Sequence, residues 1–268
     1  MNKMYLLDSI HKFGTSVEDI CRSTLGLSPS QVQETVLLSP GWVPERLFAA
    51  AEIEECVPAS PLFGYKIWNI RRDGRCATYI RCGFGAPVVM DAVLLLGLTG
   101  RCKRMLFVSS TGAISEEIGI GDLLVPEYSA AGDGAGRYLQ EDFLRDTFGE
   151  KQYPERELFS RLVNATRAAC ARHSIPWHTG RTFCTDTIAA QYSHIDRIGQ
   201  LGYNSLDMES AAAFKAANLL HIPIAALLNV SDNSAAGKSL MTRRSEEEIS
   251  RRRLVSRTVM AEILMELL

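Results

Sequence analysis

The sequence lacks any long apolar run and any marked excess of charge. None of its apolar stretches approaches the roughly 18 residues that a membrane-spanning helix needs. Residues 1–5 lack the apolar core of a secretory signal peptide. The formal net charge of -2 offers no electrostatic attraction to nucleic acid or to a membrane surface. We therefore expect a soluble, cytoplasmic protein with no nucleic-acid and no membrane partner.

Metal-binding and common catalytic signatures are missing as well. The seven cysteines are scattered and form no C-x-x-C pair, and the five histidines show no ligand spacing. We expect reduced thiols and no metal site. The G-x-S-x-G, H-E-x-x-H and P-loop patterns are absent, so the sequence does not favour a serine hydrolase, a zinc protease or a P-loop enzyme.

What the sequence does contain is an alternation of short apolar segments with helical patterns. Strands are predicted at residues 35–38, 65–71, 77–82, 104–109, 123–127, 177–185, 201–206 and 222–230. Asp73-Gly74, between the second and third of these, predicts a tight hairpin turn. Helices are predicted at residues 45–54, 88–98, 154–172 and 245–267, with another starting near Met208, and residues 128–153 are predicted to be a long surface loop. With 46% hydrophobic residues, this pattern predicts an α/β fold: a single three-layer domain with a mixed central β-sheet.

Two carboxylates stand where predicted strands end. Glu209 follows the strand at 201–206, and Asp232 follows the strand at 222–230. Taken singly, Glu209 is explained by the dipole at a helix start, and Asp232 by an N-cap or an Asx turn. Ligands of open α/β sheets bind at the carboxyl ends of strands. Together the two residues therefore favour a site that binds a polyol and transfers a proton.

Three turns of small residues also follow predicted strands directly. They lie at residues 39–41, 83–85 and 109–112. The turn at 83–85 is explained by a tight strand-to-helix connection, but three turns of this kind together also expose backbone N–H groups that can bind an anion or a sugar hydroxyl. The turn at 83–85 does not predict a dinucleotide site, because the third glycine of that motif is missing and Pro87 begins the helix.

Five short motifs, taken in order, resemble one known family, the purine nucleoside and uridine phosphorylases of the hexameric type. The resemblance covers about residues 34–235. Its motifs are Gly83-x-Gly85-Ala86-Pro87, Ser110-Thr111-Gly112-Ala113, Gly119-x-Gly121-Asp122-Leu123-Leu124-Val125-Pro126, Asp207-Met208-Glu209-Ser210 and Val230-Ser231-Asp232.

The resemblance implies a fold, an assembly and a reaction. The mixed sheet would form a distorted barrel flanked by helices, in a phosphorylase-like domain at 34–268 that follows an N-terminal extension at 1–33. The chain would be a homo-oligomer, a dimer or a hexamer built from dimers. Its partners would be a nucleoside and inorganic phosphate, which give a free base and a pentose 1-phosphate. Phosphate would be a co-substrate, with no further cofactor.

The resemblance also assigns roles to individual residues. Asp232 would be catalytic, donating a proton or a hydrogen bond to N7 of a purine base, which favours purine over pyrimidine nucleosides. Glu209 would accept hydrogen bonds from the ribose hydroxyls. The other residues expected to bind ribose or base are Met208, Thr111, Gly112, Ile188 and Ser231. Those expected to bind phosphate are Gly41, Arg46 and Ser110.

Three departures from the family pattern concern phosphate and base. Phe107 stands where the family carries a phosphate-binding arginine, Arg46 follows Gly41 by five residues instead of four, and Ile188 replaces an aromatic residue. Losing a bidentate arginine contact costs roughly 2–3 kcal/mol, or about a hundredfold in affinity. Arg46, Arg81, Arg243 and Arg244 are the candidates to replace it.

These departures leave two alternatives to a phosphorylase. One is a phosphate-independent nucleosidase of the same superfamily, in which water replaces phosphate. The other is a catalytically weakened protein that binds nucleosides.

Overall fold

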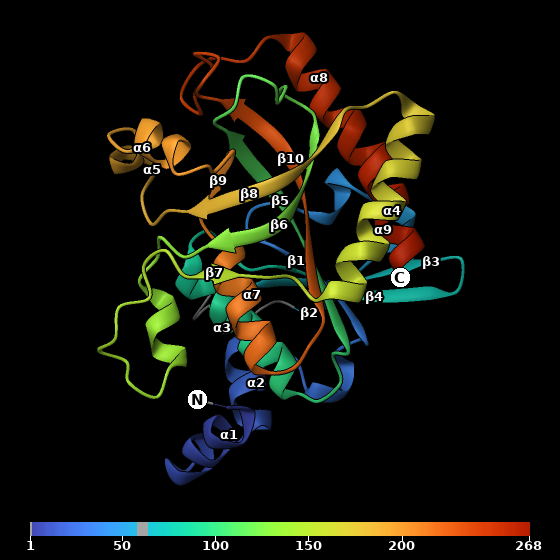
Figure 1. Cartoon of the computed structure of the whole chain (residues 1–268). Helices are drawn as coiled ribbons and strands as arrows, with labels where there is room; N and C mark the ends of the chain where they lie inside the picture. Colours follow the sequence, from blue (N-terminus) through green and yellow to red (C-terminus); the bar gives the residue numbers. More distant parts are fainter. Residues whose placement is uncertain (1, 58–63) are drawn as a thin grey trace.

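A closed ring of five strands forms the centre of the molecule (Figure 1). The computed structural model describes residues 2–57 and 64–268. The longest apolar segment of the sheet forms β10 (Ile224–Asn233), which is buried at every position and pairs with strands on both sides. Around the ring, β10 is followed by β6 (Leu123–Ala130), β8 (Trp177–Cys184), β9 (Ser205–Asp207) and β5 (Arg104–Ala113), and β5 pairs again with β10. The expected distorted barrel is confirmed.

Further strands extend the sheet outward from β5. In order they are β1 (Thr35–Ser39), β4 (Arg75–Arg81), β3 (Lys66–Arg72) and β2 (Ile53–Val57), while β7 (Lys151–Gln152) pairs with β6. Both parallel and antiparallel pairs occur, so the sheet is mixed. The predicted hairpin is confirmed: Asp73 and Gly74 both have positive φ (49° and 75°), which a tight two-residue turn requires.

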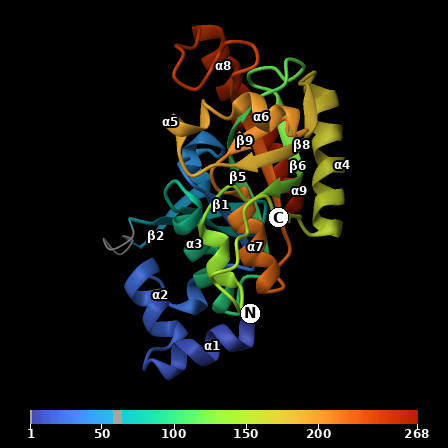
Figure 2. The same cartoon turned by 60° about the vertical axis from the view of Figure 1, so that its left-hand side comes forward.

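Helices cover the sheet on two sides and complete the three layers (Figures 1 and 2). On one side α3 (Ala86–Leu98) packs against α7 (Ser210–Leu219), and their apolar residues share one core with β10 and β5. On the other side α4 (Arg156–His173) packs against α9 (Ala261–Leu267) over a second core. The short helices α5 (Ile188–Gln191) and α6 (Ile195–Gln200) follow β8.

Residues 2–33 contain two α-helices, of which the second packs against α3. They are α1 (Lys3–Lys12) and α2 (Val17–Leu25), and a capping box of Ser16 and Asp19 starts α2. Burial of Leu25 and Leu27 in the core that contains α3 joins this segment to the sheet domain.

Two of the predicted elements differ from the structure in type or in length at residues 45–54 and 201–206. The predicted helix at 45–54 is instead two 3₁₀ turns, Pro44–Arg46 and Ala50–Glu52, followed by β2. Burial of Leu47 and Phe48 against the second core and the pairing of β2 with β3 override the helical propensity of this segment. The predicted strand at 201–206 is shorter than expected, because Leu201 ends α6 with 58% of its surface exposed and β9 begins only at Ser205.

The segment at 128–153 is less open than a surface loop. β6 continues to Ala130, a 3₁₀ turn covers Ala135–Leu139, and β7 closes the segment. Buried Ala135 and Leu139 belong to the core that contains α3 and α7.

The predicted C-terminal helix is present but irregular. It consists of α8 (Glu246–Leu254), a π-helical segment Val255–Met260 and α9. A capping box starts α8, in which Ser245 Oγ accepts from the N–H of Glu248 at 3.1 Å. π-helical turns are rare and often lie near functional sites.

Within the described part of the chain, no helix is both long enough and apolar enough to cross a membrane. The six cysteines whose side chains are described are all free thiols.

Candidate active site

One cavity of about 610 Å³ lies where β5, β9 and β10 meet the loop after β1. All ten residues that the sequence analysis proposed for substrate or phosphate line this cavity. Six of them come from β5 and the segments after β1 and β8: Gly41, Arg46, Ser110, Thr111, Gly112 and Ile188. The others, Met208, Glu209, Ser231 and Asp232, come from the segment after β9 and from β10.

A β-bulge in β10 directs Asp232 into the cavity. Val230 pairs with Thr111, and Asp232 pairs with Gly112, so Ser231 is an extra residue with no partner on β5. Neighbouring side chains of a regular strand point to opposite faces, whereas Ser231 and Asp232 both line the cavity. The predicted strand end at residue 230 is therefore wrong, since β10 continues through the bulge to Asn233.

The carboxyl group of Asp232 is buried and hydrogen-bonded by its neighbour. Ser231 Oγ donates to Oδ1 of Asp232 and also lies 3.1 Å from the carbonyl oxygen of Thr111. Burial raises the pKa of Asp232, while the bond from Ser231 and the charges of Arg244 and Arg252 act in the opposite direction. A buried carboxyl group with a raised pKa is suited to donate a proton.

Glu209 is buried between the small-residue turn at 83–85 and Asp207. Its Oε1 accepts from the N–H of Gly85 at 2.8 Å, so this turn binds a carboxylate of the protein itself. Burial, followed by the charge of Asp207, raises the pKa of Glu209 to about 8. Near neutral pH the carboxyl group of Glu209 therefore carries a proton in the ligand-free site. A ligand that donates hydrogen bonds to Glu209 can displace this proton.

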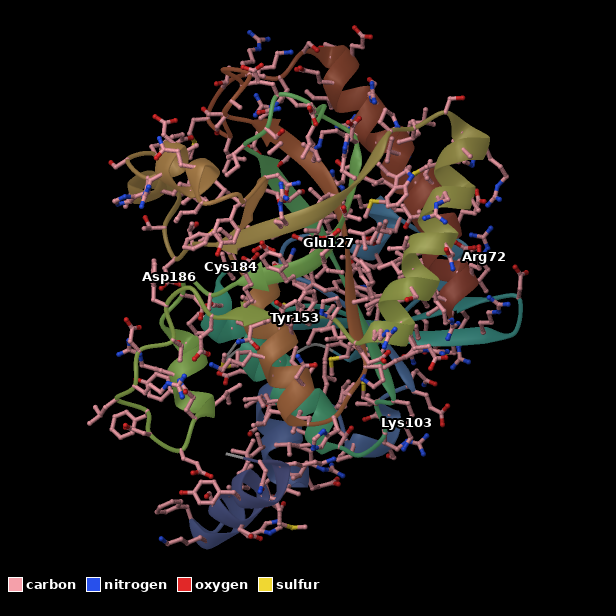
Figure 3. All side chains as sticks on the ribbon, in the orientation of Figure 1. Arg72, Lys103, Glu127, Tyr153, Cys184 and Asp186 are labelled. Carbon is pink, nitrogen blue, oxygen red and sulfur yellow. The ribbon has the colours of Figure 1, made fainter. Side chains whose placement is uncertain are left out.

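Asp207 is itself held by contacts outside the cavity. Cys184 Sγ donates to its Oδ1 at 2.7 Å, and the N–H of Ser210 bonds its Oδ2 at 3.2 Å. Cys184 is the last residue of β8, whereas Asp186 lies in the loop beyond it, outside the cavity lining (Figure 3). Burial raises the pKa of Asp207 as well.

The floor and one wall of the cavity are apolar. Met208 and Ile188 are half-buried, and Tyr192 lines the cavity with 40% of its surface exposed. Tyr192 is the C-cap residue of α5 and keeps a helical backbone conformation, so at four residues after Ile188 it lies on the same side of this turn. The hydroxyl of Thr111 does not face a ligand, since it donates to the carbonyl of Leu206 at 2.8 Å.

Trp42 organises the cationic part of the cavity. Its ring lies 3.9 Å from the guanidinium carbon of Arg46, a stacked cation–π contact, and its Nε1 donates to Ser110 Oγ at 3.2 Å. Nε of Arg46 is buried with no hydrogen-bond partner in the described structure. Burial lowers the pKa of Arg46. The Phe84 ring covers Gly41 so closely that a Cβ there would lie 2.3 Å from it.

Arg252 of α8 reaches the same cavity from the far end of the chain. Its Nη2 donates to Ser110 Oγ at 3.2 Å, and its Nε donates to Asn229 Oδ1 at 3.0 Å. Burial, followed by the charge of Arg46, lowers the pKa of Arg252 to about 10. No sequence signal links this residue to the cavity, because Arg252 is 142 positions from Ser110 and three consecutive arginines resemble an exposed charged helix face.

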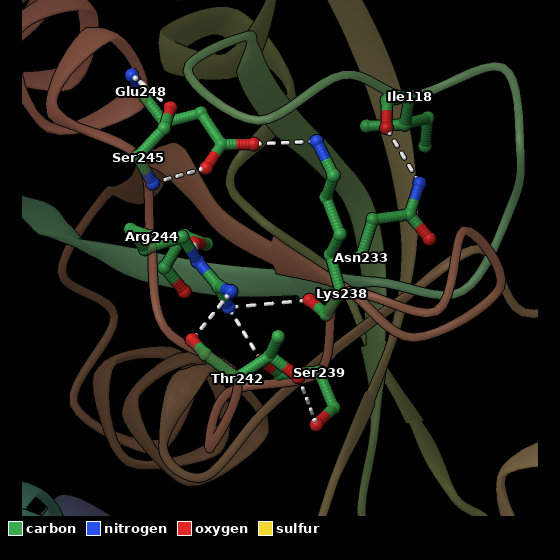
Figure 4. Close-up of polar contacts among 9 residues, drawn as sticks. Ile118, Asn233, Lys238, Ser239, Thr242, Arg244, Ser245 and Glu248 are labelled. Carbon is green, nitrogen blue, oxygen red and sulfur yellow. Dashed lines mark hydrogen bonds and ion pairs between the residues drawn. The ribbon is translucent and has the colours of Figure 1, made fainter.

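The arginines proposed from the sequence as replacements lie in different places. Arg46 lines the cavity, whereas Arg81 and Arg243 do not. Arg244 is occupied by the backbone: it donates to the carbonyl oxygens of Thr242 at 2.7 Å, Ser239 at 2.6 Å and Lys238 at 3.1 Å (Figure 4). Phe107 is fully buried in the core and presents nothing to the cavity.

Other lining residues escaped the sequence analysis too. Gln191 and Tyr192 could have been found from their helical spacing to Ile188, and Trp42 from its position beside Gly41. No comparable signal marks Leu240, which belongs to the loop after β10. Within residues 2–57 and 64–268, no group of three or more His, Cys, Asp and Glu side chains is arranged to hold a metal ion.

Comparison with known proteins identifies relatives of similar sequence. Purine nucleoside phosphorylase DeoD-type of Streptococcus pneumoniae (strain CGSP14) is 21% identical over 161 residues, and that of Streptococcus pyogenes serotype M5 (strain Manfredo) is 22% identical over the same length. Each match covers 60% of this chain and 64% of the relative, less than two thirds of its length.

A solved structure shows the shared fold over almost the whole chain. Uridine phosphorylase from Vibrio fischeri ES114 superposes with a TM-score of 0.71, covering 91% of this chain and 97% of that one at 19% identity. The sequence pattern of the Phosphorylase superfamily matches residues 43–268, which includes every residue lining the cavity except Gly41 and Trp42. The family that the sequence motifs predicted is confirmed, and the chain belongs to the phosphorylase superfamily.

Proposed function

We propose that this protein is a nucleoside phosphorylase that cleaves the N-glycosidic bond of a purine nucleoside with inorganic phosphate. The products are a free base and a pentose 1-phosphate. One observation carries the proposal: a single cavity exposes both buried carboxyl groups of raised pKa, Asp232 and Glu209, and the guanidinium group of Arg46. Cleaving a nucleoside with an anion requires both kinds of group.

The leaving base is the first requirement. When the bond between C1′ and the base nitrogen breaks, its electron pair moves to the base, which becomes negatively charged. Asp232 is placed to donate its proton to that base, and general acid catalysis of this kind contributes typically 10²–10⁴-fold. The raised pKa of Asp232 keeps the proton available for transfer.

The sugar and the nucleophile are the second requirement. Glu209 hydrogen-bonds the ribose hydroxyls and fixes the ring in the cavity. A phosphate oxygen forms the new bond to C1′ as the base departs, and its negative charge stabilises the positive charge that develops on the sugar. Arg46, the Ser110 hydroxyl and the N–H of Gly41 hold the phosphate. The side chains supply every group that this reaction needs, so we propose no cofactor beyond phosphate.

The preference for purines rests on Asp232. A purine offers N7 as a hydrogen-bond acceptor at the base edge, and burial raises the pKa of Asp232, which favours the protonated form that would donate to N7. The relatives matched by sequence are named purine nucleoside phosphorylases, whereas the superposed structure is named a uridine phosphorylase. Base preference is therefore the part of the proposal that most needs an assay.

A nucleosidase is the second candidate, and one observation favours it. Phe107 is fully buried, so β5 provides no arginine to the cavity. With weaker anion binding, water could take the place of phosphate. A third outcome, binding without cleavage, would leave the ribose groups in place without turnover.

We also propose a homo-oligomer, a dimer or a hexamer of dimers, that covers the mouth of the cavity. Phe84 lines the cavity with 72% of its surface exposed, and Leu240 lines it with 42% exposed. Exposed apolar side chains at the rim of a binding site are typical of protein–protein contacts. Light scattering coupled to size-exclusion chromatography would give the mass in solution.

The decisive experiment separates phosphorolysis from hydrolysis. The protein is incubated with inosine, adenosine and uridine, each with and without inorganic phosphate, and free base is followed by chromatography. We expect release of the purine bases only in the presence of phosphate, together with ribose 1-phosphate. Equal release without phosphate would establish the nucleosidase, uridine cleavage alone would refute the purine preference, and binding without release would refute catalysis.

A further inference from the structure

Arg252 is a largely buried cation without a carboxylate partner. Its hydrogen bonds go to two neutral groups, Asn229 Oδ1 and Ser110 Oγ. Among the described ion pairs none involves Arg252 or Arg46, although nine other arginine and lysine side chains in the described part of the chain do have carboxylate partners. The charge of Asp232 acts on Arg252, but the two side chains form no ion pair in the described structure. A buried charge without an ion pair is costly, so two such cations facing one cavity indicate a missing anion.

The hydroxyl of Ser110 points to the same conclusion. Its oxygen accepts from Trp42 Nε1 and from Arg252 Nη2, both at 3.2 Å. A serine hydroxyl has two acceptor positions and one proton. With both acceptor positions filled by the protein, the proton of Ser110 is left to donate, and its residue lines the cavity. The acceptor that it lacks would be supplied by an oxygen of a bound anion.

Arg251, the residue before Arg252, fixes the direction in which the Arg252 side chain points. Arg251 Nη2 pairs with Asp122 Oδ1 at 2.9 Å, and Asp122 also bonds His178 at 3.0 Å and the N–H of Gly119 at 2.8 Å. This contact anchors α8 on the loop before β6. Arg252, the next residue of the helix, is thereby directed across β10 to Asn229 and into the cavity.

Positive charge continues beyond the cavity. An adjoining cavity of about 370 Å³ shares Gly41, Trp42 and Arg46 with it and is also lined by Arg253 and Arg257. Arg46 therefore faces cations on two sides, with Glu45 the one carboxylate among the residues that line this second space. The surroundings of Arg46 favour a ligand that carries more than one negative charge, as inorganic phosphate does.

We propose that Arg252 is a phosphate ligand of this enzyme and that it acts with Arg46 as a pair of guanidinium groups around the anion. This inference rests on the proposed function and adds a residue to it. Arg252 comes from the C-terminal helix, whereas Ser110 and Arg46 come from β5 and from the turn after β1. The charge that β5 lacks at Phe107 is supplied from another element, and the Ser110 hydroxyl contacts both guanidinium and anion.

The test compares three variants with the wild-type protein. Arg252→Gln removes the charge and retains hydrogen-bonding groups, Arg252→Lys keeps the charge without the bidentate geometry, and Arg243→Gln removes one charge from an exposed residue outside the cavity. Two quantities are measured: binding of inorganic phosphate alone by calorimetry, and the KM values for phosphate and for nucleoside. Melting temperatures without phosphate verify that each variant is folded.

We expect Arg252→Gln to weaken phosphate binding and to raise the phosphate KM by about a hundredfold, the loss expected for a charge-assisted bidentate contact. The nucleoside KM should change much less. Arg252→Lys should recover part of the affinity, and Arg243→Gln should match wild type. A structural role for Arg252 would instead lower the melting temperature and impair both substrates alike.

The outcomes separate this inference from the proposed function. Phosphate-dependent cleavage with an unchanged phosphate KM in Arg252→Gln would overturn the role of Arg252 and leave the function standing. The wild-type protein could bind phosphate without cleaving any nucleoside, while Arg252→Gln fails to bind phosphate. That result would support the site and refute the function. Absence of phosphate binding to the wild-type protein would overturn both.

Discussion

The carboxylate of Asp232 occupies the space that a side chain on Gly112 would need. A Cβ built on Gly112 would lie 2.8 Å from Oδ2 of Asp232, closer than such atoms approach in folded proteins. The two residues are register partners on β10 and β5, directly beyond the bulge at Ser231. Gly112 therefore determines how far Asp232 can reach across the cavity.

Gly112→Ala is expected to displace the Asp232 carboxylate and to slow cleavage by about a hundredfold, because a shift of about 1 Å in a catalytic group has an effect of that size. Steady-state kinetics with inosine would measure it. Gly199→Ala is the control, since a Cβ on Gly199 meets nothing within 4 Å. Unchanged kinetics in Gly112→Ala would mean that the position of Asp232 does not limit the reaction.

Asp232→Asn should reduce kcat for purine nucleosides by roughly 10²–10⁴-fold, because an amide cannot donate the proton that the leaving base needs. Binding of the nucleoside should change little, since the amide preserves the shape of the side chain. Single-turnover kinetics and equilibrium binding measure the two effects. Asp186→Asn, in the exposed loop after β8, serves as the control (Figure 3). Near-normal turnover in Asp232→Asn would rule out its acid role.

Stability without ligand should depend on pH through Glu209. Its pKa of about 8 in the folded protein lies above the usual 4.5, so the folded state holds a proton that the unfolded chain has released between these values. The stabilisation is complete below about pH 4.5 and is lost as the pH rises through about 8, with a slope of up to about 1.4 kcal/mol per pH unit.

Urea denaturation at several pH values between 5 and 8 would measure this slope. Glu209→Gln does not titrate and should show a shallower decline, with the remainder due to groups such as Asp207, whose pKa is also raised. Parallel slopes for the two proteins would show that Glu209 is already ionised at neutral pH in the folded state.

Tyr192 is expected to stack on the base, in place of the aromatic residue that the family pattern has near Ile188. Stacking of a base on an aromatic ring contributes about 1–3 kcal/mol, so Tyr192→Ala should raise the nucleoside KM by roughly 5- to 100-fold. Tyr192→Phe keeps the ring and should resemble wild type. An equal loss in both variants would assign the effect to the hydroxyl and not to stacking.

The sequence by itself predicted the parts that depend on local pattern. The apolar segments indicated most of the strands, and Asp73-Gly74 indicated the hairpin, because side-chain periodicity and turn conformation are properties of a few consecutive residues. The order of the motifs was enough to predict the family, and the resemblance also pointed to ten of the residues that line the cavity. Their roles stay predictions until the variants above are measured.

The tertiary structure decided what depends on contacts between distant residues. At residues 45–54 the burial of Leu47 and Phe48 and the pairing of β2 with β3 override the helical propensity of the segment. The bulge at Ser231 arises from the register between β10 and β5, and no local pattern encodes it. Arg252 enters the cavity only because Asp122 holds Arg251 and Asn229 receives Arg252 across β10. Side chains more than a hundred residues apart in sequence become neighbours only through packing. Only the folded chain therefore shows that a charge missing from one element is replaced by a charge from another.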